Sequence, residues 1–203
     1  MKYLEFYQEL KAFKVFSISD VRLIFPNFDN RRLVEWQQKK YISKIIKGYY
    51  YFNDNEPDEI FVNKVANRIY NPSYISMENA LSYYGFIPEG VFASTSVTTR
   101  NTAKFDTPLG LFDYKHIKSN LFFGYKLIQK NGMVFKMAEP EKVILDFLYF
   151  RKINDIETMS AIRFNKNSVQ EHINMLKLDN YLTVYDSAIL QKRINLFKIN
   201  IHA

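Results

Sequence analysis

"NFDNRRLVEWQQKKYISKIIKGYYYF", the stretch from Asn27 to Phe52, decides how this chain folds. It carries six Lys and Arg residues and the single tryptophan of the chain, Trp36. Apolar residues recur at helical spacing in its first half, while its second half alternates β-branched and aromatic residues around Gly48. The stretch therefore predicts a short basic helix followed by a two-stranded β-hairpin.

Two further helices are predicted ahead of this stretch. The apolar side of the first is expected to hold Leu4, Tyr7, Leu10 and Phe13. The sequence "SISD" (Ser17–Asp20) fits a capping box at the start of the second helix, which Pro26 ends. Asp29 is the expected N-cap of the third, basic helix, which is predicted to run from Asn30 to about Lys40.

Three short helices followed by a ribbon are the layout of a winged helix-turn-helix domain, which is predicted here over residues 1–53. In that layout the third helix enters the major groove of DNA, and the ribbon touches the DNA backbone or the minor groove. Residues 1–52 carry ten Lys and Arg against five Asp and Glu, a balance of +5 within a chain total of +7. This excess of positive charge favours a polyanionic partner. The alternative is a helical module that binds another protein and leaves its charges in water.

The phase of the third helix determines which of its residues face DNA. At about 100° per residue, Leu33, Trp36 and the aliphatic stem of Lys40 fall on the side toward the core. The opposite side is centred on Arg31 and Gln38. This outward side is flanked by Val34 and Glu35.

The outward residues suit DNA recognition, because Arg can pair with guanine and Gln with adenine in the major groove. The predicted base-reading residues are Asn30, Arg31 and Gln38. Phosphate contacts supply much of the affinity, and each adds about −0.9 to the salt slope of binding. The predicted phosphate-binding residues are Arg32, Lys39, Lys40, Lys44, Lys47 and Tyr49.

The acidic stretch "NDNEPDE" (residues 53–59) predicts a linker to a second, larger domain over residues 60–203. That domain is expected to be mixed, with strands within 91–137 and helices within 139–198. Its local signals are a Ser76 cap with Gly85 as the helix end, an Asn131-Gly132 hairpin turn, Pro140 as a first helical residue and a Ser168 cap. The fold class predicted for the whole chain is α+β.

Composition narrows the classes of function. The chain has no cysteine, which excludes disulfides and thiolate metal sites and fits a reducing, cytoplasmic setting. No signal peptide is expected, because the first sixteen residues, "MKYLEFYQELKAFKVF", are amphipathic and lack an apolar h-region. No membrane partner is expected, because no run of about 18 apolar residues occurs. His116, His172 and His202 are far apart, so no metal is predicted, and no cofactor is expected either.

One alternative is catalytic. Asp113 and Lys115 fit half of a metal-dependent nuclease site, with Asp106 as the partner carboxylate. Such a site needs carboxylates around Mg²⁺ and a lysine that stabilises charge. This spacing is common by chance, and Asp106 begins a turn-like stretch, so the protein is not expected to be an enzyme.

Several stretches resemble one known family. "FSISDVRLIFPNFDNRRLVEWQQKKYISKIIKGYYYF" (16–52) is similar to the N-terminal winged helix of AbiEi-type antitoxins, which belong to bacterial toxin–antitoxin and abortive-infection systems. "YISMENALSYYGFIPEGVFASTSVTTRNTAKFDTPLGLFDYKHIKSNLFFGY" (74–125) resembles the central block of that family in the order of its helix, strand and turn motifs. "AEPEKVILDFLY" (138–149) looks like the helix that follows.

The resemblance implies a dual role. The first domain would bind double-stranded operator DNA and repress its own operon, and the second would counteract a co-transcribed nucleotidyltransferase toxin, with or without direct binding. The protein would act as a monomer or as a cooperative pair on inverted repeats. Family wings often carry Arg where this chain has Lys44 and Lys47, and Lys lacks the bidentate geometry of Arg. The rival class is a stand-alone winged-helix regulator whose second domain senses a ligand.

Overall fold

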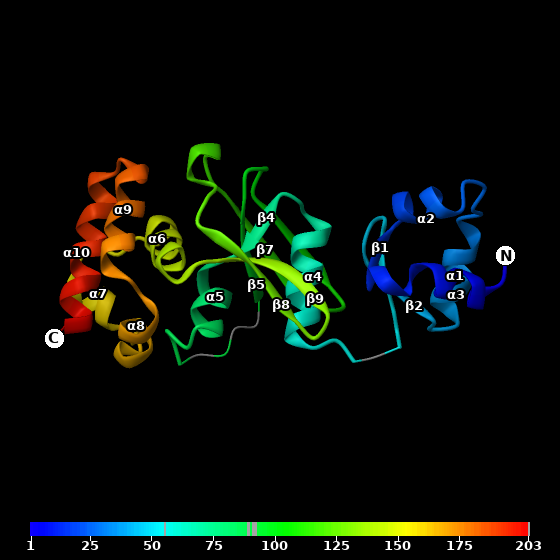
Figure 1. The fold of residues 1–203 in the computed structure, drawn as a ribbon, viewed down its shortest axis with the longest axis horizontal. Helices are drawn as coiled ribbons and strands as arrows, with labels where there is room; N and C mark the ends of the chain where they lie inside the picture. Colours follow the sequence, from blue (N-terminus) through cyan, green and yellow to red (C-terminus); the bar gives the residue numbers. More distant parts are fainter. Residues whose placement is uncertain (55, 89, 91–92, 203) are drawn as a thin grey trace.

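The computed structural model describes residues 1–54, 56–88, 90 and 93–202. The fold is mixed α+β, with helices toward the N-terminal end and a helical C-terminal end (Figure 1). This general class confirms the prediction from sequence. Within the described ranges, no helix is both long enough and apolar enough to cross a membrane.

The N-terminal part, residues 1–54, holds three α-helices and a small antiparallel sheet in the order β1-β3-β2. Its elements are α1 (Tyr3–Leu10), the 3-10 turn η1 (Lys11–Phe13), β1 (Val15–Ser17), α2 (Ile18–Ile24), α3 (Arg31–Gln38), β2 (Ile42–Ile46) and β3 (Tyr49–Phe52). The helices and the hairpin of β2 and β3 lie where the sequence predicts them. The sequence does not predict β1, because three residues are too few to show an alternating pattern.

The helix starts follow local side-chain bonds. At α2, the Ser17 Oγ accepts from the Asp20 amide at 3.1 Å and the Asp20 carboxylate accepts from the Ser17 amide at 2.7 Å, so the predicted capping box is present. At α3, the N-cap is Asn30 rather than Asp29, although Asp29 Oδ1 accepts from the Arg31 amide at 3.0 Å. The predicted start of α3 is therefore early by one residue.

Helix α1 turns a different side to the core from the one predicted. Phe6 and Leu10 are fully buried, and Tyr7 packs beside them. Leu4 is 64% exposed, and Phe13 lies in η1 with 38% of its surface exposed. The prediction is wrong at Leu4 and Phe13, because a stripe centred on Phe6 buries a large aromatic ring instead.

The three-stranded sheet is buried on both faces. One face carries Phe16 and Phe52 and packs against the helices, where the rings of Phe6 and Trp36 lie 4.5 Å apart between centroids. The other face contributes to the core of the rest of the chain through Val15, Ile45 and Tyr51. The N-terminal part is therefore packed against its neighbour through apolar side chains.

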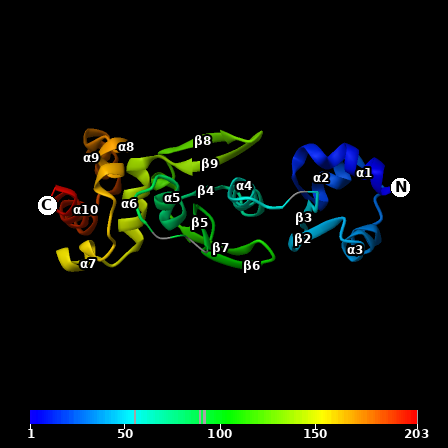
Figure 2. The ribbon, with the colours of Figure 1, turned by 90° about the horizontal axis from the view of Figure 1, so that it is seen from below.

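A six-stranded sheet forms the centre of the second part, in the order β6-β7-β5-β4-β9-β8. The pairs β5–β7 and β4–β9 are parallel and the other neighbours are antiparallel. The strands are β4 (Ser73–Ile75), β5 (Ala93–Thr98), β6 (Ala103–Thr107), β7 (Gly110–His116), β8 (Tyr125–Lys130) and β9 (Met133–Ala138). Seen from below, α4 lies between the β6–β7 and β8–β9 hairpins, on the side of the sheet nearest the N-terminal part (Figure 2).

Helices surround this sheet and form the end of the molecule opposite the N-terminal part (Figure 1). The helical elements are α4 (Glu59–Ile69), α5 (Met77–Tyr83), the 3-10 turn η2 (Ser119–Leu121), α6 (Pro140–Phe150), α7 (Ile156–Ser160), α8 (Lys166–His172), α9 (Met175–Tyr185) and α10 (Ala188–His202). The predicted helical start at Pro140 is confirmed. Asn131 and Gly132, with φ of 51° and 72°, form the predicted turn between β8 and β9.

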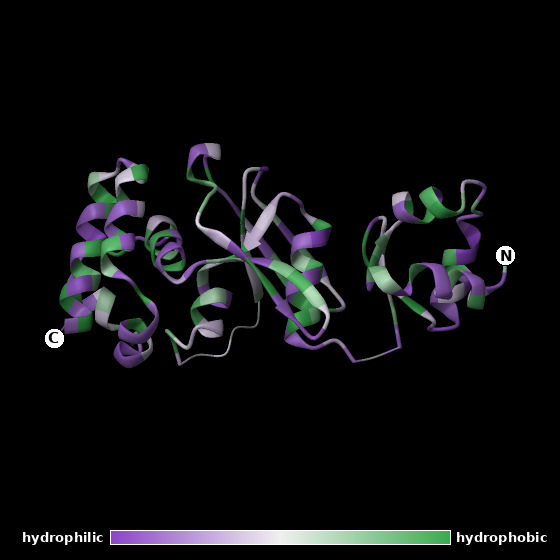
Figure 3. Ribbon diagram, viewed as in Figure 1, coloured by the Kyte–Doolittle hydropathy of each residue, from purple (hydrophilic) through white to green (hydrophobic). Residues whose placement is uncertain are grey.

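The predicted outline of the second part misses its first two elements. Helix α4 and strand β4 precede the predicted strand range of 91–137, whose residues 91 and 92 lie outside the described residues. Asp58, expected in the linker, caps α4 by accepting from the Phe61 amide at 2.7 Å. The joining segment is therefore shorter than predicted, and those of its residues that the structure describes are mainly hydrophilic (Figure 3).

One predicted cap stands at the expected position without its hydrogen bond, and another is wrong. Ser76 precedes α5, but its hydroxyl donates to Asp146 at 2.8 Å and makes no cap bond. Helix α8 begins after Asn165, whose side chain accepts from the Ser168 amide at 3.2 Å, so Ser168 is capped rather than capping. At α5, Asp146 is distant in the sequence and accepts the hydrogen bond of the Ser76 hydroxyl. At α8, Asn165 stands three residues before Ser168 and supplies the cap instead.

Helix α6 buries an ion pair in the core. Lys142 and Asp146 are both fully buried and are bonded to each other. The Asp146 carboxylate also accepts from the hydroxyls of Tyr74 at 3.0 Å, Ser76 at 2.8 Å and Tyr185 at 2.8 Å. Burial lowers the pKa of Lys142, while Asp146 opposes that shift. This network ties α6 to β4 and α9.

Candidate nucleic-acid interface

Helix α3 has the orientation that its sequence pattern predicts. Leu33 and Trp36 are each only 2% exposed and point into the N-terminal core. Arg31, Val34 and Gln38 lie on the opposite, exposed side. The Arg31 side chain is 91% exposed, so α3 offers a long polar side chain to any partner of this surface.

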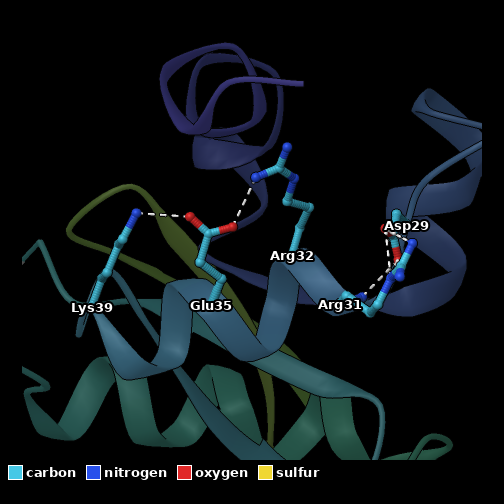
Figure 4. Close-up of polar contacts among 5 residues, drawn as sticks. All are labelled: Asp29, Arg31, Arg32, Glu35 and Lys39. Atoms are coloured by element: carbon cyan, nitrogen blue, oxygen red, sulfur yellow. Dashed lines mark hydrogen bonds and ion pairs between the residues drawn. The ribbon is translucent and has the colours of Figure 1, made fainter.

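Arg31 is held by its neighbour Asp29 at the start of α3 (Figure 4). The Arg31 Nε donates to Asp29 Oδ2 at 2.9 Å, and its Nη2 lies 2.9 Å from the same oxygen. The hydrogen bond from Arg31 keeps the pKa of Asp29 below its usual value, so this carboxylate stays charged. Asp29 therefore orients Arg31 in the free protein and also competes with any other anion for it.

Glu35 lies between Arg32 and Lys39 along one side of α3 (Figure 4). It accepts from Arg32 Nη1 at 2.8 Å and from Lys39 Nζ at 2.7 Å. These hydrogen bonds, from Lys39 first and Arg32 second, lower the pKa of Glu35. Two of the predicted phosphate-binding cations thus already have a carboxylate partner.

The hairpin of β2 and β3 presents two exposed cations, Lys44 and Lys47. Gly48 adopts φ of +86° at its tip, and the Gly48 carbonyl accepts from the Ile18 amide at 3.1 Å. Strand β1 pairs with β3 as far as Tyr49. The tip is therefore fixed to the start of α2 and does not project beyond the sheet.

Lys40 and Asn30 lie at the two ends of α3. Lys40 is exposed beyond the helix with φ of +57°, and its carbonyl accepts from Asn53 Nδ2 at 3.0 Å. The prediction that the Lys40 stem packs on the core side is wrong, because α3 ends at Gln38 and the chain turns there. Asn30 is exposed in helical conformation and makes no side-chain cap bond.

The residues of the nuclease alternative do not gather into a metal site. Asp113 Oδ2 lies 3.1 Å from Lys115 Nζ and 3.5 Å from Lys104 Nζ. Asp106 pairs across the sheet with Leu111 rather than with Asp113. Within the part of the chain that the structure describes, no group of three His, Cys, Asp or Glu residues is placed to hold a metal ion.

Sequence reasoning missed a second basic region beside the hairpin. Tyr49 of β3 lines a hollow of about 510 Å³ together with Lys64, Arg68 and Arg100. Lys64 and Arg68 are four residues apart on α4, and this spacing puts them on one face of the helix. That part of the region could have been found from the sequence. The meeting of this face with Arg100 and the hairpin depends on the tertiary fold and has no local signal.

No protein-family model and no curated protein matches this chain. What supports an interface on α3 and the hairpin is therefore the geometry and the charge of that surface.

Proposed function

We propose that the protein is a DNA-binding antitoxin that represses its own operon and counteracts a nucleotidyltransferase toxin. The observation that carries the DNA-binding role is the exposed side of α3, where Arg31 and Gln38 point away from a core built on Leu33 and Trp36. The basic hairpin beside it supplies further cations. The antitoxin role is supported by the sequence resemblance to AbiEi-type antitoxins.

In this proposal the N-terminal part is a winged helix-turn-helix. Helices α1 to α3 and the sheet order β1-β3-β2 support it, with α3 as the helix that enters the major groove. Asn30, Arg31 and Gln38 read base edges. The backbone is held by Arg32, Lys39, Lys40, Lys44, Lys47 and Tyr49.

The DNA-binding role is tested by gel shift on the DNA upstream of the gene. Arg31→Ala should weaken binding to the operator by about tenfold to a hundredfold, because it removes a bidentate base contact. Lys192→Ala, which removes an exposed cation from α10, is the control and should bind like the wild type. Equal affinities for Arg31→Ala and Lys192→Ala would remove Arg31 from the interface.

The antitoxin role is tested by co-expression with the neighbouring reading frame. The full chain should restore growth, and a pull-down should show whether the toxin is bound directly. A chain without residues 1–52 should lose repression and keep part of the rescue. A truncated chain that folds and rescues nothing would contradict this division of roles. In this proposal the protein acts in the cytoplasm, and it binds the operator as a monomer or as a cooperative pair on inverted repeats.

A second candidate function, a regulator that senses a small ligand, is favoured by one observation. A hollow of about 560 Å³ is lined by Asp113, Lys115, Glu78 and Arg151, and Asp113 Oδ1 is buried without a hydrogen-bond partner among the described residues. The neighbouring gene separates the two candidates. A nucleotidyltransferase encoded beside this gene supports the antitoxin, and its absence supports the sensor.

A further inference from the structure

A basic hollow adjoins the hairpin at the contact between the N-terminal part and α4. It measures about 510 Å³ and is lined by Tyr49, Lys64, Asn67, Arg68 and Arg100, among others. None of the described residues that line it is acidic. A surface depression that gathers cations in this way attracts polyanions.

The cations of the hollow are fixed by the fold. Arg68 Nη2 donates to the Asp20 carboxylate at 2.5 Å, which holds α4 beside the start of α2. Arg100 lies over the Tyr70 ring, 4.0 Å from its centroid, and donates to the Asn71 carbonyl at 3.4 Å. Donors held by a rigid scaffold lose little entropy when they bind an anion.

The hollow also holds donors that the protein leaves unused. Lys64 Nζ makes no salt bridge to a carboxylate of the described residues, and its pKa is lowered by burial and by the nearby charge of Arg68. Asn67 Oδ1 accepts from the Lys136 amide, whereas Asn67 Nδ2 is buried and has no partner in the described ranges. An anion with several oxygen atoms can bind Lys64 beside the guanidinium groups of Arg68 and Arg100.

We propose that this hollow binds the phosphate backbone of the DNA beside the site that α3 reads. The inference rests on the proposed DNA-binding function and extends the contact into the second part of the chain. Tyr49 connects the two regions, because it belongs to the hairpin and also lines the hollow. Contacts of this kind add affinity and fix orientation, and they carry no sequence information.

The test is Lys64→Glu in the full chain, with a labelled random-sequence DNA duplex as the probe across a series of KCl concentrations. Because a Glu at position 64 stands four residues before Arg68 and can compete with Asp20 for it, thermal unfolding of the variant is measured alongside binding. Binding should weaken by about tenfold, and the salt slope should fall by about 0.9 for each phosphate that the variant no longer neutralises. Lys64→Gln should act in the same direction to a smaller extent.

The matched control is Lys192→Glu, the same charge reversal on α10, which lies in the C-terminal helical end and away from α4 (Figure 1). If Lys64→Glu and Lys192→Glu bind with equal affinity and salt slope while the wild type binds DNA, the hollow does not touch DNA and the role of α3 stands. A wild-type chain that binds neither this probe nor its upstream DNA overturns the DNA-binding function itself. Tighter binding of an RNA duplex that depends on Lys64 would overturn the assignment to DNA.

Discussion

Glu35 is the only acidic residue of α3, and it lies between two of the cations assigned to DNA contacts. In the free protein, Arg32 and Lys39 are both paired with it. In the proposed DNA complex, phosphate groups would compete with this carboxylate for the same cations, and its own charge would repel them. The positive charge that α3 offers to DNA is therefore smaller than its count of Lys and Arg suggests.

Replacing Glu35 by Gln should strengthen DNA binding. The substitution frees Arg32 and Lys39 and removes one negative charge from the exposed side of α3. Affinity at low salt should rise by roughly twofold to fivefold, the effect expected of a single exposed charge. A fluorescence anisotropy titration measures this, with Glu171→Gln on α8 as the control for net charge. Weaker binding by Glu35→Gln would show that Glu35 contacts a base.

Asp146 is the centre of the buried network in the second part, so the two members of its ion pair differ in importance. Asp146→Ala leaves Lys142 buried without its carboxylate and three hydroxyls without their acceptor, which should cost about 3–5 kcal/mol of stability. Lys142→Met leaves Asp146 with three hydroxyl donors and should cost less. Urea unfolding followed by circular dichroism compares the two variants. An equal or larger loss for Lys142→Met would contradict this order.

At the scale of elements, two glycines with similar backbone conformations have different surroundings. Gly124 (φ +66°) precedes β8, and a Cβ there would lie 2.9 Å from Tyr181 Cε2 and 3.3 Å from Lys142 Cβ. Gly132 (φ +72°) lies in the β8–β9 turn with nothing within 4 Å of the corresponding position. Backbone strain is therefore common to both positions, and steric overlap occurs at only one.

Gly124→Ala should therefore destabilise the protein more than Gly132→Ala. The left-handed conformation costs about 1–2 kcal/mol for any residue with a Cβ, and this applies to both variants. Overpacking against Tyr181 and Lys142 should add about 1–3 kcal/mol at position 124 alone. Thermal unfolding of the two variants measures the difference. Equal losses would mean that α9 moves freely away from this site.

Elements with local signals could be predicted from the sequence, and elements held by distant partners could not. The capping box at Ser17 and the Asn131-Gly132 turn are decided by neighbouring residues, and both are present. The phase of α3 follows from Leu33 and Trp36 in the same way. In contrast, β1 exists through its pairing with β3, and the Ser76 hydroxyl is taken by Asp146, seventy residues away in the chain.

The candidate site likewise has parts that could be predicted from the sequence and a part that could not. The outward side of α3 could be predicted because a helix of eight residues fixes the direction of each side chain. The pairing of Arg32 and Lys39 with Glu35 also follows from their three- and four-residue spacings. The basic hollow could not be predicted, because Tyr49, Lys64 and Arg100 meet only when the small sheet packs beside α4.

At the scale of the whole molecule, Asp20 connects the two parts. Its carboxylate caps α2 through Ser17 and accepts from Arg68 of α4. Burial alone would raise the pKa of Asp20, but the hydrogen bonds from Arg68 and Ser17 lower it below its usual value. A carboxylate of this kind stabilises the fold above its unfolded pKa, and the contribution is lost as the pH falls through the folded pKa.

Asp20→Asn should therefore destabilise the protein at neutral pH and matter less in acid. At about pH 7 the variant should lose about 1 kcal/mol through the weakened cap, and the gap to the wild type should close as the pH falls below about 4. Urea unfolding at several pH values measures the gap. A gap that stays constant across the range would mean that the charge of Asp20 contributes nothing.

The sheet that is apolar on both faces has a mechanical consequence. Because Val15, Ile45 and Tyr51 are anchored in the larger core, the N-terminal part, which we propose binds DNA, is not free to turn about its joining segment. Its angle to the remainder of the chain is set by packed side chains. In the proposed DNA complex, we expect two copies on neighbouring half-sites to bind together only over a narrow range of distances between the half-sites.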